Sequence, residues 1–534
     1  MRRPWRTLAT LLFLGAILTG SLAGDRLLAR AEETRDTLRV YTELLSVAHD
    51  SYGSDVTFRD LVFASIQGML RSLDPHTSFL TPKAYTGMRE RQQSSFFGLG
   101  ILISQRNGQL TVITPIEGTP ASRLGIRAGD IIATIEGEPT DSMSTDDAVE
   151  RLKGPKGTQV HIEIVRRGIP EPIKLTVTRA EIPQITVRYA YMMDENTGYI
   201  WLTDFHRASS QEVAKAIADL KAQGMKQLIF DLRNNGGGLL DQAIEISEQF
   251  VPRGGRIVET RGRTSDSMQS FEAAGRLPEV GLPVIVLVNR GSASASEIVS
   301  GAIQDHDVGL IVGTPTWGKG LVQTVYNLPY GAGLALTTAK YYTPSGRLIQ
   351  RDFSSYFDYF NVQDEAVEPT VAQNAAVYHT DLGRDVFGGG GITPDVLVEN
   401  EELSHFSQIL LARNAFQNFA VDFLRTAKVE TPDWRPRAEL LERFKAWLGE
   451  EQVATAEQIE SGFAEETDRP FMLRMIGAEV LNANFGQVAQ HRLIAEGDLQ
   501  IQRGLALFGK AQELLAQRQA AGAAKALEDR RENR

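Results

Sequence analysis

The sequence predicts a multidomain α/β protein, in which a β-rich module with helices precedes an α/β core and helical regions flank the two. Three changes of pattern along the chain support this fold class. Apolar residues recur at helical spacing up to about residue 93, short strands separated by turn residues follow over residues 96–180, and strands then alternate with helices over residues 198–398. A chain of 534 residues is also too long for a single hydrophobic core, so we expect several domains.

The N-terminus has the pattern of a secretory signal peptide. Three arginines among the first six residues precede an apolar run over residues 8–23, and small residues then offer cleavage sites after Ala23 and Ala31. Residues 1–31 are therefore predicted to be a signal peptide. An uncleaved membrane anchor is the alternative, for which the run is slightly shorter than the ~20 residues that span a bilayer. We expect an exported protein of the periplasm or cell envelope, associated with the membrane if this segment is retained.

Composition excludes several classes of function. Hydrophobic residues make up 42% of the chain and charged residues 23%, as in globular proteins. A net charge of −11 disfavours nucleic-acid binding, which depends on cationic contacts to phosphates. The absence of cysteine excludes disulfides, thiolate nucleophiles and Cys-ligated zinc. We expect no nucleic-acid partner, no metal and no cofactor.

Both flanking regions are predicted to be helical. Residues 32–95 carry apolar residues such as Leu38 and Leu44 at helical spacing, with an interruption at Asp74–Thr77. Scaffold or subunit contact is the simplest role for this N-terminal helical region. Residues 400–534 are rich in Ala, Gln, Glu and Leu, and they predict a C-terminal helical region. Its helices either pack on the body of the protein or form a module for oligomerisation or partner docking.

Residues 96–180 are predicted to form a β-rich domain. A glycine-containing loop at Phe96–Gly100 and a later turn at Leu124–Asp130 together resemble the PDZ domain. Such a loop exposes backbone N–H groups to a terminal carboxylate, and the edge of the following strand accepts the peptide as an added strand. A glycine-rich hairpin without a ligand is the alternative. The expected strands are residues 101–103, 109–113, 130–135, 159–165 and 173–177. The peptide-binding residues that the resemblance implies are Phe97, Gly98, Leu99 and Gly100.

Residues 181–399 are predicted to form the α/β core. Tyr199–Phe205 is expected to be a strand, and Ser209 with Glu212 is expected to form a capping box at the start of the next helix. The apolar run Val284–Val288 lacks alternation, which indicates a parallel strand covered on both faces. Open α/β sheets bind ligands beyond the carboxyl ends of their strands, so we expect the chemistry to follow this run.

A turn of small residues, Gly291–Ser296, follows the buried strand and leads into a predicted helix. Such a turn lets a hydroxyl project while the helix N-terminus presents unpaired N–H groups toward an oxyanion. A serine nucleophile needs a base to take its proton. His206, near a strand end, is one candidate, and Lys319, flanked by glycines, is another, because burial can turn an amine into a base. A phosphate-binding or surface lysine is the alternative for that glycine loop.

Three motifs occur in one order along the core: Asp231–Gly238, Ser292–Glu297 and Gly318–Gln323. They resemble the carboxyl-terminal processing peptidases, which are PDZ-containing Ser-Lys serine proteases of the tail-specific protease type. The likeness spans residues 38–398. It implies a PDZ domain inserted ahead of an α/β peptidase core, with helical N- and C-terminal regions on either side.

The position of each motif implies a role for particular residues. Ser294 corresponds to the nucleophile and Lys319 to its general base. Gln323 resembles the polar residue that orients the lysine amine. The likeness places the oxyanion hole at the backbone N–H groups of Gly238 and Ala295, and a glycine loop and a helix start can indeed direct two amides at one point.

The resemblance implies a serine endopeptidase that cleaves protein substrates near their C-termini through an acyl-enzyme, with the substrate tail captured by the PDZ domain. The partners it implies are proteins or peptides with exposed C-termini, an adaptor or activator protein, and further copies of the chain in a homo-oligomer. Two alternatives stay open: a PDZ-bearing envelope adaptor without turnover, and a hydrolase of another ester or amide that uses His206 as base. Asp305 lies where some family members have a functional acid, but it also fits a structural residue at a helix end.

Overall fold

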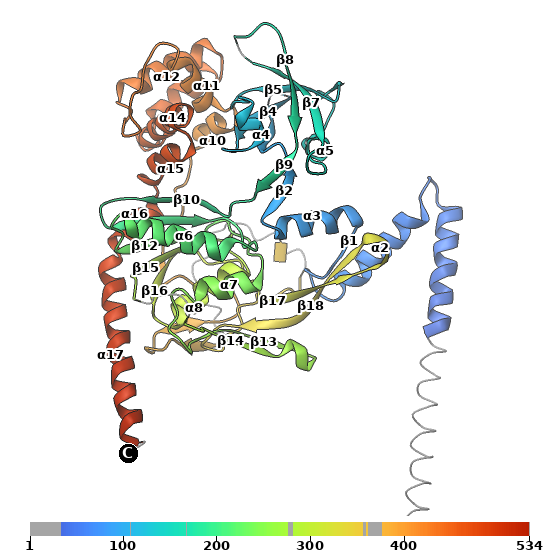
Figure 1. Ribbon diagram of the computed structural model, residues 1–534, viewed down its shortest axis with the longest axis vertical. Helices are drawn as coiled ribbons and strands as arrows, with labels where there is room; N and C mark the ends of the chain where they lie inside the picture. Colours follow the sequence, from blue (N-terminus) through green and yellow to red (C-terminus); the bar gives the residue numbers. More distant parts are fainter. Residues whose placement is uncertain are drawn as a thin grey trace, which may run out of the picture. The chain divides into compact units, whose positions relative to one another are not determined.

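The computed structural model describes residues 34–106, 108–166, 168–275, 281–355, 359–360 and 376–532. The predicted signal peptide, residues 1–31, lies outside the described residues. The chain divides into two compact units, of which the first comprises Met1–Pro82 with Gln323–Thr337, and the second comprises Lys83–Val322 with Thr338–Arg534. Figure 1 follows the elements in chain order.

The first unit is mainly helical, as the apolar spacing predicts. A helix covers residues 34–51, and helix α2 (Phe58–Arg71) begins at Thr57, whose hydroxyl accepts the N–H of Asp60 at 3.1 Å. The interruption at Asp74–Thr77 leads into a short strand, β1 (Ser78–Leu80), which the sequence does not reveal because three residues are too few to show alternation.

Strand β18 (Gly333–Tyr342) belongs to both units. In the first unit its residues 333–335 pair antiparallel with β1, and in the second unit its residues 339–342 pair antiparallel with β13 (Arg256–Gly262). Strand β17 (Leu321–Asn327) also pairs with β18, and a 3₁₀ turn at Pro329–Gly331 separates the two strands. One continuous strand therefore carries residues of both units.

The PDZ-like region contains the five predicted strands in one antiparallel sheet of order β3-β4-β5-β7-β8. Its core is formed by buried aliphatic side chains that alternate along the strands, as in Val160, Ile162 and Ile164. The strands are β3 (Ile101–Arg106), β4 (Gln109–Pro115), β5 (Ile131–Ile135), β7 (Gln159–Val165) and β8 (Ile173–Thr178), with β6 (Glu138–Pro139) paired to β5. The flanking elements are β2 (Ser95–Gly98), β9 (Ala180–Pro183), α4 (Pro120–Arg123) and α5 (Thr145–Leu152), and helix α3 (Pro82–Gln92) precedes them.

A six-stranded sheet of order β10-β11-β12-β15-β16-β21 forms the centre of the core. All neighbours except β10 and β11 run parallel. Every residue of β15 is buried, as the unbroken apolar run predicts. The bounds are β10 (Val187–Met192), β11 (Thr197–Leu202), β12 (Gln227–Asp231), β15 (Val284–Val288), β16 (Gly309–Gly313) and β21 (Val396–Leu397).

Helices cover both faces of this sheet (Figure 1). The side chains of Val284, Val286 and Val288 join the apolar core beneath α6 (Ser209–Ala222), α7 (Leu240–Ser247) and α8 (Ala295–Asp305). The alternate residues Ile285 and Leu287 join a second core beneath α16 (Leu499–Ala506) and α17 (Phe508–Glu532). Because successive side chains of a strand point to opposite faces, one strand supplies two cores. The remaining strands of the core are β14 (Gln269–Glu272), β19 (Val377–His379) and β20 (Asp385–Phe387), with a 3₁₀ turn at Ser265–Ser267.

The C-terminal region is helical, as predicted, and its helices follow two patterns. Helices α16 and α17 pack on the central sheet, whereas α10 to α14 build a separate core rich in aromatic residues. Their bounds are α10 (His405–Ala412), α11 (Ala415–Phe423), α12 (Glu439–Glu450), α13 (Ala456–Ala464), α14 (Asp468–Phe485) and α15 (Gln487–Ala495).

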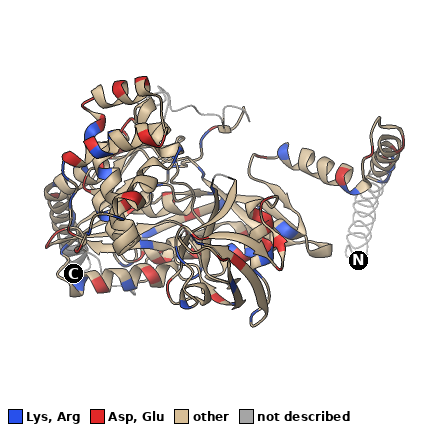
Figure 2. Cartoon of the chain, turned by 90° about the horizontal axis from the view of Figure 1, so that it is seen from above, with Lys and Arg blue, Asp and Glu red and all other residues tan. Residues whose placement is uncertain are grey.

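Among the described helices, none combines the length and the apolar character needed to cross a bilayer. Basic and acidic residues are interspersed over the described elements in Figure 2.

Two local predictions differ from the structure. The strand expected at Tyr199–Phe205 is β11, which begins at Thr197 and ends at Leu202. Ser209 and Glu212 do not form a capping box, because α6 begins at Ser209 itself, after Ala208. The Glu212 carboxylate instead accepts the N–H and the hydroxyl of Thr186, at 2.7 and 2.9 Å, and the N–H of Val187 at 3.0 Å. A tertiary contact with the preceding chain has replaced the local one.

Candidate active site

Ser294 stands between the buried strand β15 and helix α8, in a conformation that few non-glycine residues adopt. Its φ of 56° and ψ of −111° cost roughly 1–3 kcal/mol, which the surrounding contacts must hold in place. Just before it, the Ser292 hydroxyl donates to Leu232 O at 2.8 Å, and the Ala293 N–H donates to Asn235 O at 3.0 Å. The turn is therefore fastened to the loop that follows strand β12.

That loop brings glycine backbone against Ser294. A Cβ placed on Gly237 would lie 2.6 Å from Ala293 O and 2.8 Å from Ser294 Cβ, and its φ is +92°. Only glycine fits, for both reasons. The Gly237 N–H donates to Asn235 Oδ1 at 2.9 Å, so it is already engaged.

The N–H groups of Gly238 and Ala295, which are predicted to form an oxyanion hole, differ from the Gly237 N–H in their hydrogen bonding. Across the residues that the structure describes, neither the Gly238 N–H nor the Ala295 N–H has an intramolecular acceptor. Gly238 is exposed, and Ala295 is the first residue of α8, where N–H groups have no partner within the helix. Both groups are therefore available to an anion.

Lys319 lies in the segment after strand β16, and this segment is fastened to the serine turn. The Trp317 N–H donates to Ser292 O at 2.9 Å. Ser294 and Lys319 are each neither fully buried nor fully exposed. The structure thus brings the two residues into one region through backbone contacts.

The carboxylate of Glu297, one turn into α8, links the two segments directly. Its Oε2 accepts the N–H groups of Ser294 at 2.7 Å and Lys319 at 2.9 Å. Its Oε1 accepts the Gly318 N–H at 2.7 Å and the Thr316 hydroxyl at 2.6 Å. The side chain is completely buried, and burial raises the pKa of Glu297, while the four hydrogen bonds oppose that rise. No ion pair is needed to explain a buried carboxylate with four donors.

Tyr341 makes a second link. Its hydroxyl donates toward the carbonyl of Ser294 at 3.1 Å and toward the carbonyl of Lys319. The sequence did not single out Glu297 or Tyr341. The position of Glu297, three residues after a helix-starting serine, matches a capping box and could have indicated it. Tyr341 lies on a distant strand, so nothing local could have indicated its role.

Gln323 falls on strand β17, in the first unit. There its side-chain amide donates to His76 O at 2.5 Å. The carboxylate of Asp74 holds that turn by accepting the N–H groups of His76 and Thr77, each at 2.8 Å. Burial alone would raise the pKa of Asp74, but hydrogen bonds from the Thr77 hydroxyl and these backbone groups lower it. The interruption seen in the sequence is thus an ordered turn.

The predicted peptide-binding loop lies at one end of the PDZ-like sheet. Phe97 is exposed, whereas Gly98, Leu99 and Gly100 are buried, with Leu99 in the domain core. Within the described ranges, the N–H groups of Leu99 and Gly100 have no intramolecular acceptor. Strand β3, which follows the loop, is an edge strand of its sheet.

His206 and Asp305, the other candidates, lie in different surroundings. The His206 imidazole is 3.0 Å from the Asp204 carboxylate. Asp305 ends α8, far along the helix from Ser294, and its carboxylate accepts the guanidinium of the fully buried Arg347 at 2.7 Å. The contacts of Asp305 are those of a structural residue at a helix end.

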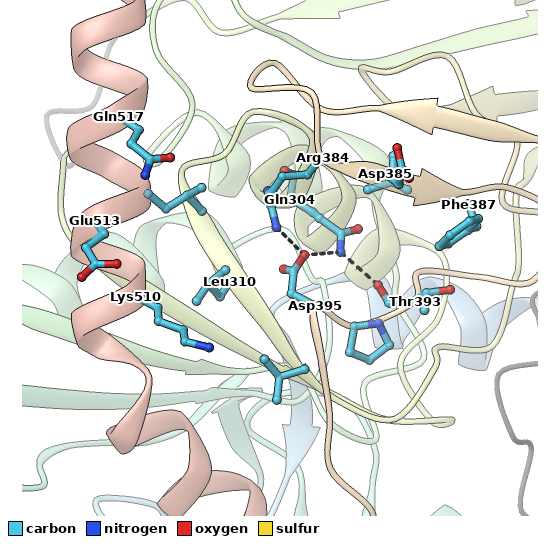
Figure 3. Close-up of a pocket in the computed structure, with 14 residues that line it drawn as sticks. Gln304, Leu310, Arg384, Asp385, Phe387, Thr393, Asp395, Lys510, Glu513 and Gln517 are labelled. Atoms are coloured by element: carbon cyan, nitrogen blue, oxygen red, sulfur yellow. Dashed lines mark hydrogen bonds and ion pairs between the residues drawn. The ribbon is translucent and has the colours of Figure 1, made fainter.

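A cavity of about 490 Å³ lies beside this end of α8, under α17 (Figure 3). Arg384 and Asp395 form an ion pair in its wall, and Gln304 donates to Asp395 at 3.1 Å. None of the predicted site residues lines this cavity.

Comparison with known proteins identifies the family. Residues 196–354 match peptidase family S41, and residues 111–166 match the PDZ domain. A carboxy-terminal-processing protease of Bartonella bacilliformis is 39% identical over 317 residues, which cover 58% of this chain and 70% of that protein. The chain belongs to the carboxy-terminal processing proteases. A carboxyl-terminal-processing protease of Synechocystis is also 39% identical, over 294 residues that cover 54% of this chain and 68% of that protein. A solved photosystem II D1 C-terminal processing protease is 29% identical with a TM-score of 0.35, covering 66% of this chain and 85% of that chain.

The two family-model matches and the two curated relatives confirm the predicted family and fold class. The protein is a serine-type peptidase of family S41 in which a PDZ domain precedes the peptidase core and a helical region follows it. The turn at Ser294, with its φ of 56°, lies within the matched peptidase segment.

Proposed function

We propose that the protein is a serine endopeptidase that cleaves protein substrates near their C-termini through an acyl-enzyme, with Ser294 as nucleophile and Lys319 as general base. The observation that carries the proposal is the convergence at Ser294 of a helix N-terminus, the Gly237 backbone and the Lys319 segment. Gln323 is proposed to orient the lysine amine, as the family pattern implies.

Stabilisation of the tetrahedral intermediate would come from backbone N–H groups. Gly238 and Ala295 have N–H groups that nothing in the described part of the chain accepts, and they flank the close contact between Gly237 and Ser294. The positive end of the α8 dipole points toward the same place. An oxyanion that forms at a carbonyl attacked by Ser294 would meet two donors fixed in position before the reaction.

The PDZ domain is proposed to capture the substrate tail. Strand β3 offers an unpaired edge, and α5 packs beside it, so an extended peptide can add as a further strand between them. The unpaired N–H groups of Leu99 and Gly100 lie at the start of this edge, where a terminal carboxylate needs donors. Proteins with exposed C-termini are therefore the proposed substrates.

Cleavage of an unfolded protein by the purified chain, expressed without residues 1–31, tests the mechanism. Ser294→Ala and Lys319→Ala are each expected to lower kcat by at least about 10³-fold, since the members of a catalytic dyad act as a unit. Ser300→Ala, further along α8, and Lys340→Ala, on an exposed position of β18, serve as matched controls. Equal cleavage by all variants would contradict the mechanism.

Tail capture is tested separately by binding. A peptide with a free C-terminal carboxylate is expected to bind at least about tenfold more tightly than the same peptide with an amidated C-terminus, because the amide lacks the charge that the N–H groups accept. Retained tail binding without any hydrolysis by the unmodified chain would favour the adaptor alternative.

We also propose export to the periplasm or cell envelope, an adaptor or activator partner, and a homo-oligomer. The N-terminal residues 8–23 support export through their apolar character. Leu38, Leu44 and Val47 support an oligomer, because all three are more than half exposed on the helix of residues 34–51. Cell fractionation tests the location, and light scattering of Leu44→Glu beside the unmodified chain tests the oligomer.

A further inference from the structure

The Tyr341 hydroxyl contacts the two segments that carry Ser294 and Lys319, although Tyr341 itself belongs to neither. The residue lies on β18 opposite Thr260 of β13, and only 2% of its surface is exposed. Its N–H donates to Gly320 O at 3.0 Å, which fixes the strand beside the lysine segment. Its hydroxyl lies 3.1 Å from Ser294 O and also within hydrogen-bond distance of Lys319 O.

The contact with Ser294 O involves a particular peptide bond. The carbonyl of Ser294 and the N–H of Ala295 belong to the same planar amide, and they point in opposite directions from it. A hydrogen bond accepted by that carbonyl polarises the amide and strengthens its N–H as a donor by about 10–30%. The bond also resists rotation of the amide plane. Whatever holds the Ser294 carbonyl therefore holds the direction of the Ala295 N–H.

The same carbonyl already accepts the N–H groups of Glu297 and Ile298, at 2.8 and 3.0 Å, from within the first turn of α8. Those bonds belong to the helix and would form in any helix. The Tyr341 hydroxyl is the donor that comes from a different element, and it approaches a residue with the unusual φ of 56°. It thus ties the strained turn to the strand layer.

We propose that Tyr341 is a positioning residue for the oxyanion hole, which fixes and polarises the Ser294–Ala295 amide through its hydroxyl. This inference rests on the proposed function, in which the Ala295 N–H stabilises the oxyanion. A phenol has one proton, so at any moment the hydroxyl donates to one of the two carbonyls, and only the bond to Ser294 O acts on the Ser294–Ala295 amide. Burial holds the pKa of Tyr341 well above its ordinary value, so the hydroxyl remains a donor throughout the working pH range.

Tyr341→Phe removes only the hydroxyl and keeps the ring in the core. The expected result is a fall in kcat of about tenfold with KM changed by less than about twofold, because the weakened Ala295 N–H binds the oxyanion only in the transition state. Affinity for a peptide boronate, whose tetrahedral adduct with Ser294 places an oxygen in the hole, should fall by a similar factor. Binding of the uncleaved peptide should not change.

Tyr199→Phe is the matched control. Tyr199 is also fully buried in the core, and its hydroxyl donates to Asp231 Oδ2 at 2.7 Å, so the substitution removes one buried hydroxyl without touching the serine turn. We expect Tyr199→Phe to lower the unfolding midpoint but to leave kcat within twofold.

Three other outcomes would contradict either the inference about Tyr341 or the proposed function. A Tyr341→Phe variant with kcat and boronate affinity equal to those of Tyr199→Phe would overturn the inference while leaving the proposed function intact. A shift in the pH–rate profile with unchanged boronate affinity would also overturn it, because the hydroxyl would then act on Lys319 instead. If Ser294→Ala retains full activity, the proposed function itself fails, and the effect of Tyr341→Phe on the boronate would disappear with it.

Discussion

Replacement of Glu297 by glutamine tests how the two segments at Ser294 and Lys319 are held together. Glu297 accepts two hydrogen bonds on each carboxylate oxygen. A glutamine amide has one oxygen, and its nitrogen is a donor, so in either orientation two donors lose their acceptor and face a further N–H.

The expected change in the free energy of unfolding follows from the burial of the Glu297 side chain. Each buried donor left without an acceptor costs about 1–3 kcal/mol, so Glu297→Gln should cost about 2–6 kcal/mol. Glutamine avoids the penalty of burying a charge, which offsets part of this cost. The amide can satisfy either Ser294 with Lys319 or Gly318 with Thr316, but not both sets. We therefore expect the loss to appear in activity of the folded protein as well as in stability.

The assay combines denaturant unfolding with peptidase activity per folded molecule. Glu212→Gln is the matched control, because Glu212 accepts its three hydrogen bonds on a single oxygen, Oε2, which a glutamine oxygen can replace. Glu212→Gln should change the free energy of unfolding by less than about 1 kcal/mol. If Glu297→Gln matches Glu212→Gln in both stability and activity, the four-bond arrangement does not hold the site.

Three further substitutions give separate predictions. Gly237→Ala should lower activity by about 10²-fold, because its Cβ would lie 2.6 Å from Ala293 O beside the serine turn. Asp305→Asn should destabilise the fold by about 3–5 kcal/mol, since it removes the charge that pairs with the buried Arg347, yet activity per folded molecule should persist. His491 has its pKa lowered from 6.5 to about 4 by burial, so the unfolded chain binds a proton first as pH falls. Between pH 7 and 5 this residue should remove on the order of 2 kcal/mol of stability, and His491→Gln should abolish that part of the pH dependence.

Each of these predictions has its own control. Gly236→Ala should be tolerated, because no atom lies within 4 Å of its Cβ position and its φ is not positive. Asp266→Asn, on the surface, should leave stability unchanged. Full inactivation of a stable Asp305→Asn variant would show that Asp305 takes part in the chemistry. A pH-independent stability difference between His491→Gln and the unmodified chain would contradict the proton linkage.

The sequence alone was sufficient for the buried strand β15 of the central sheet and for the family. The run Val284–Val288 is apolar without alternation because both faces are covered, and a local pattern of this kind needs no knowledge of what covers them. The three motifs indicated the family because their order along the chain is itself sequence information, and the comparisons bear it out.

Only the tertiary structure could assign partners to individual side chains. The capping box expected at Ser209 does not form, because Glu212 finds donors in the segment that runs past it. In the sequence, Glu297 looks like any acidic residue of a helix, and only the fold places the N–H groups of Gly318 and Lys319 against its carboxylate. Likewise, only the fold brings the Tyr341 hydroxyl to two carbonyls of other segments. Periodicity records which face of an element is buried, since burial depends on local spacing. The periodicity does not indicate which distant donor bonds to which acceptor, because that pairing depends on how the chain folds back on itself.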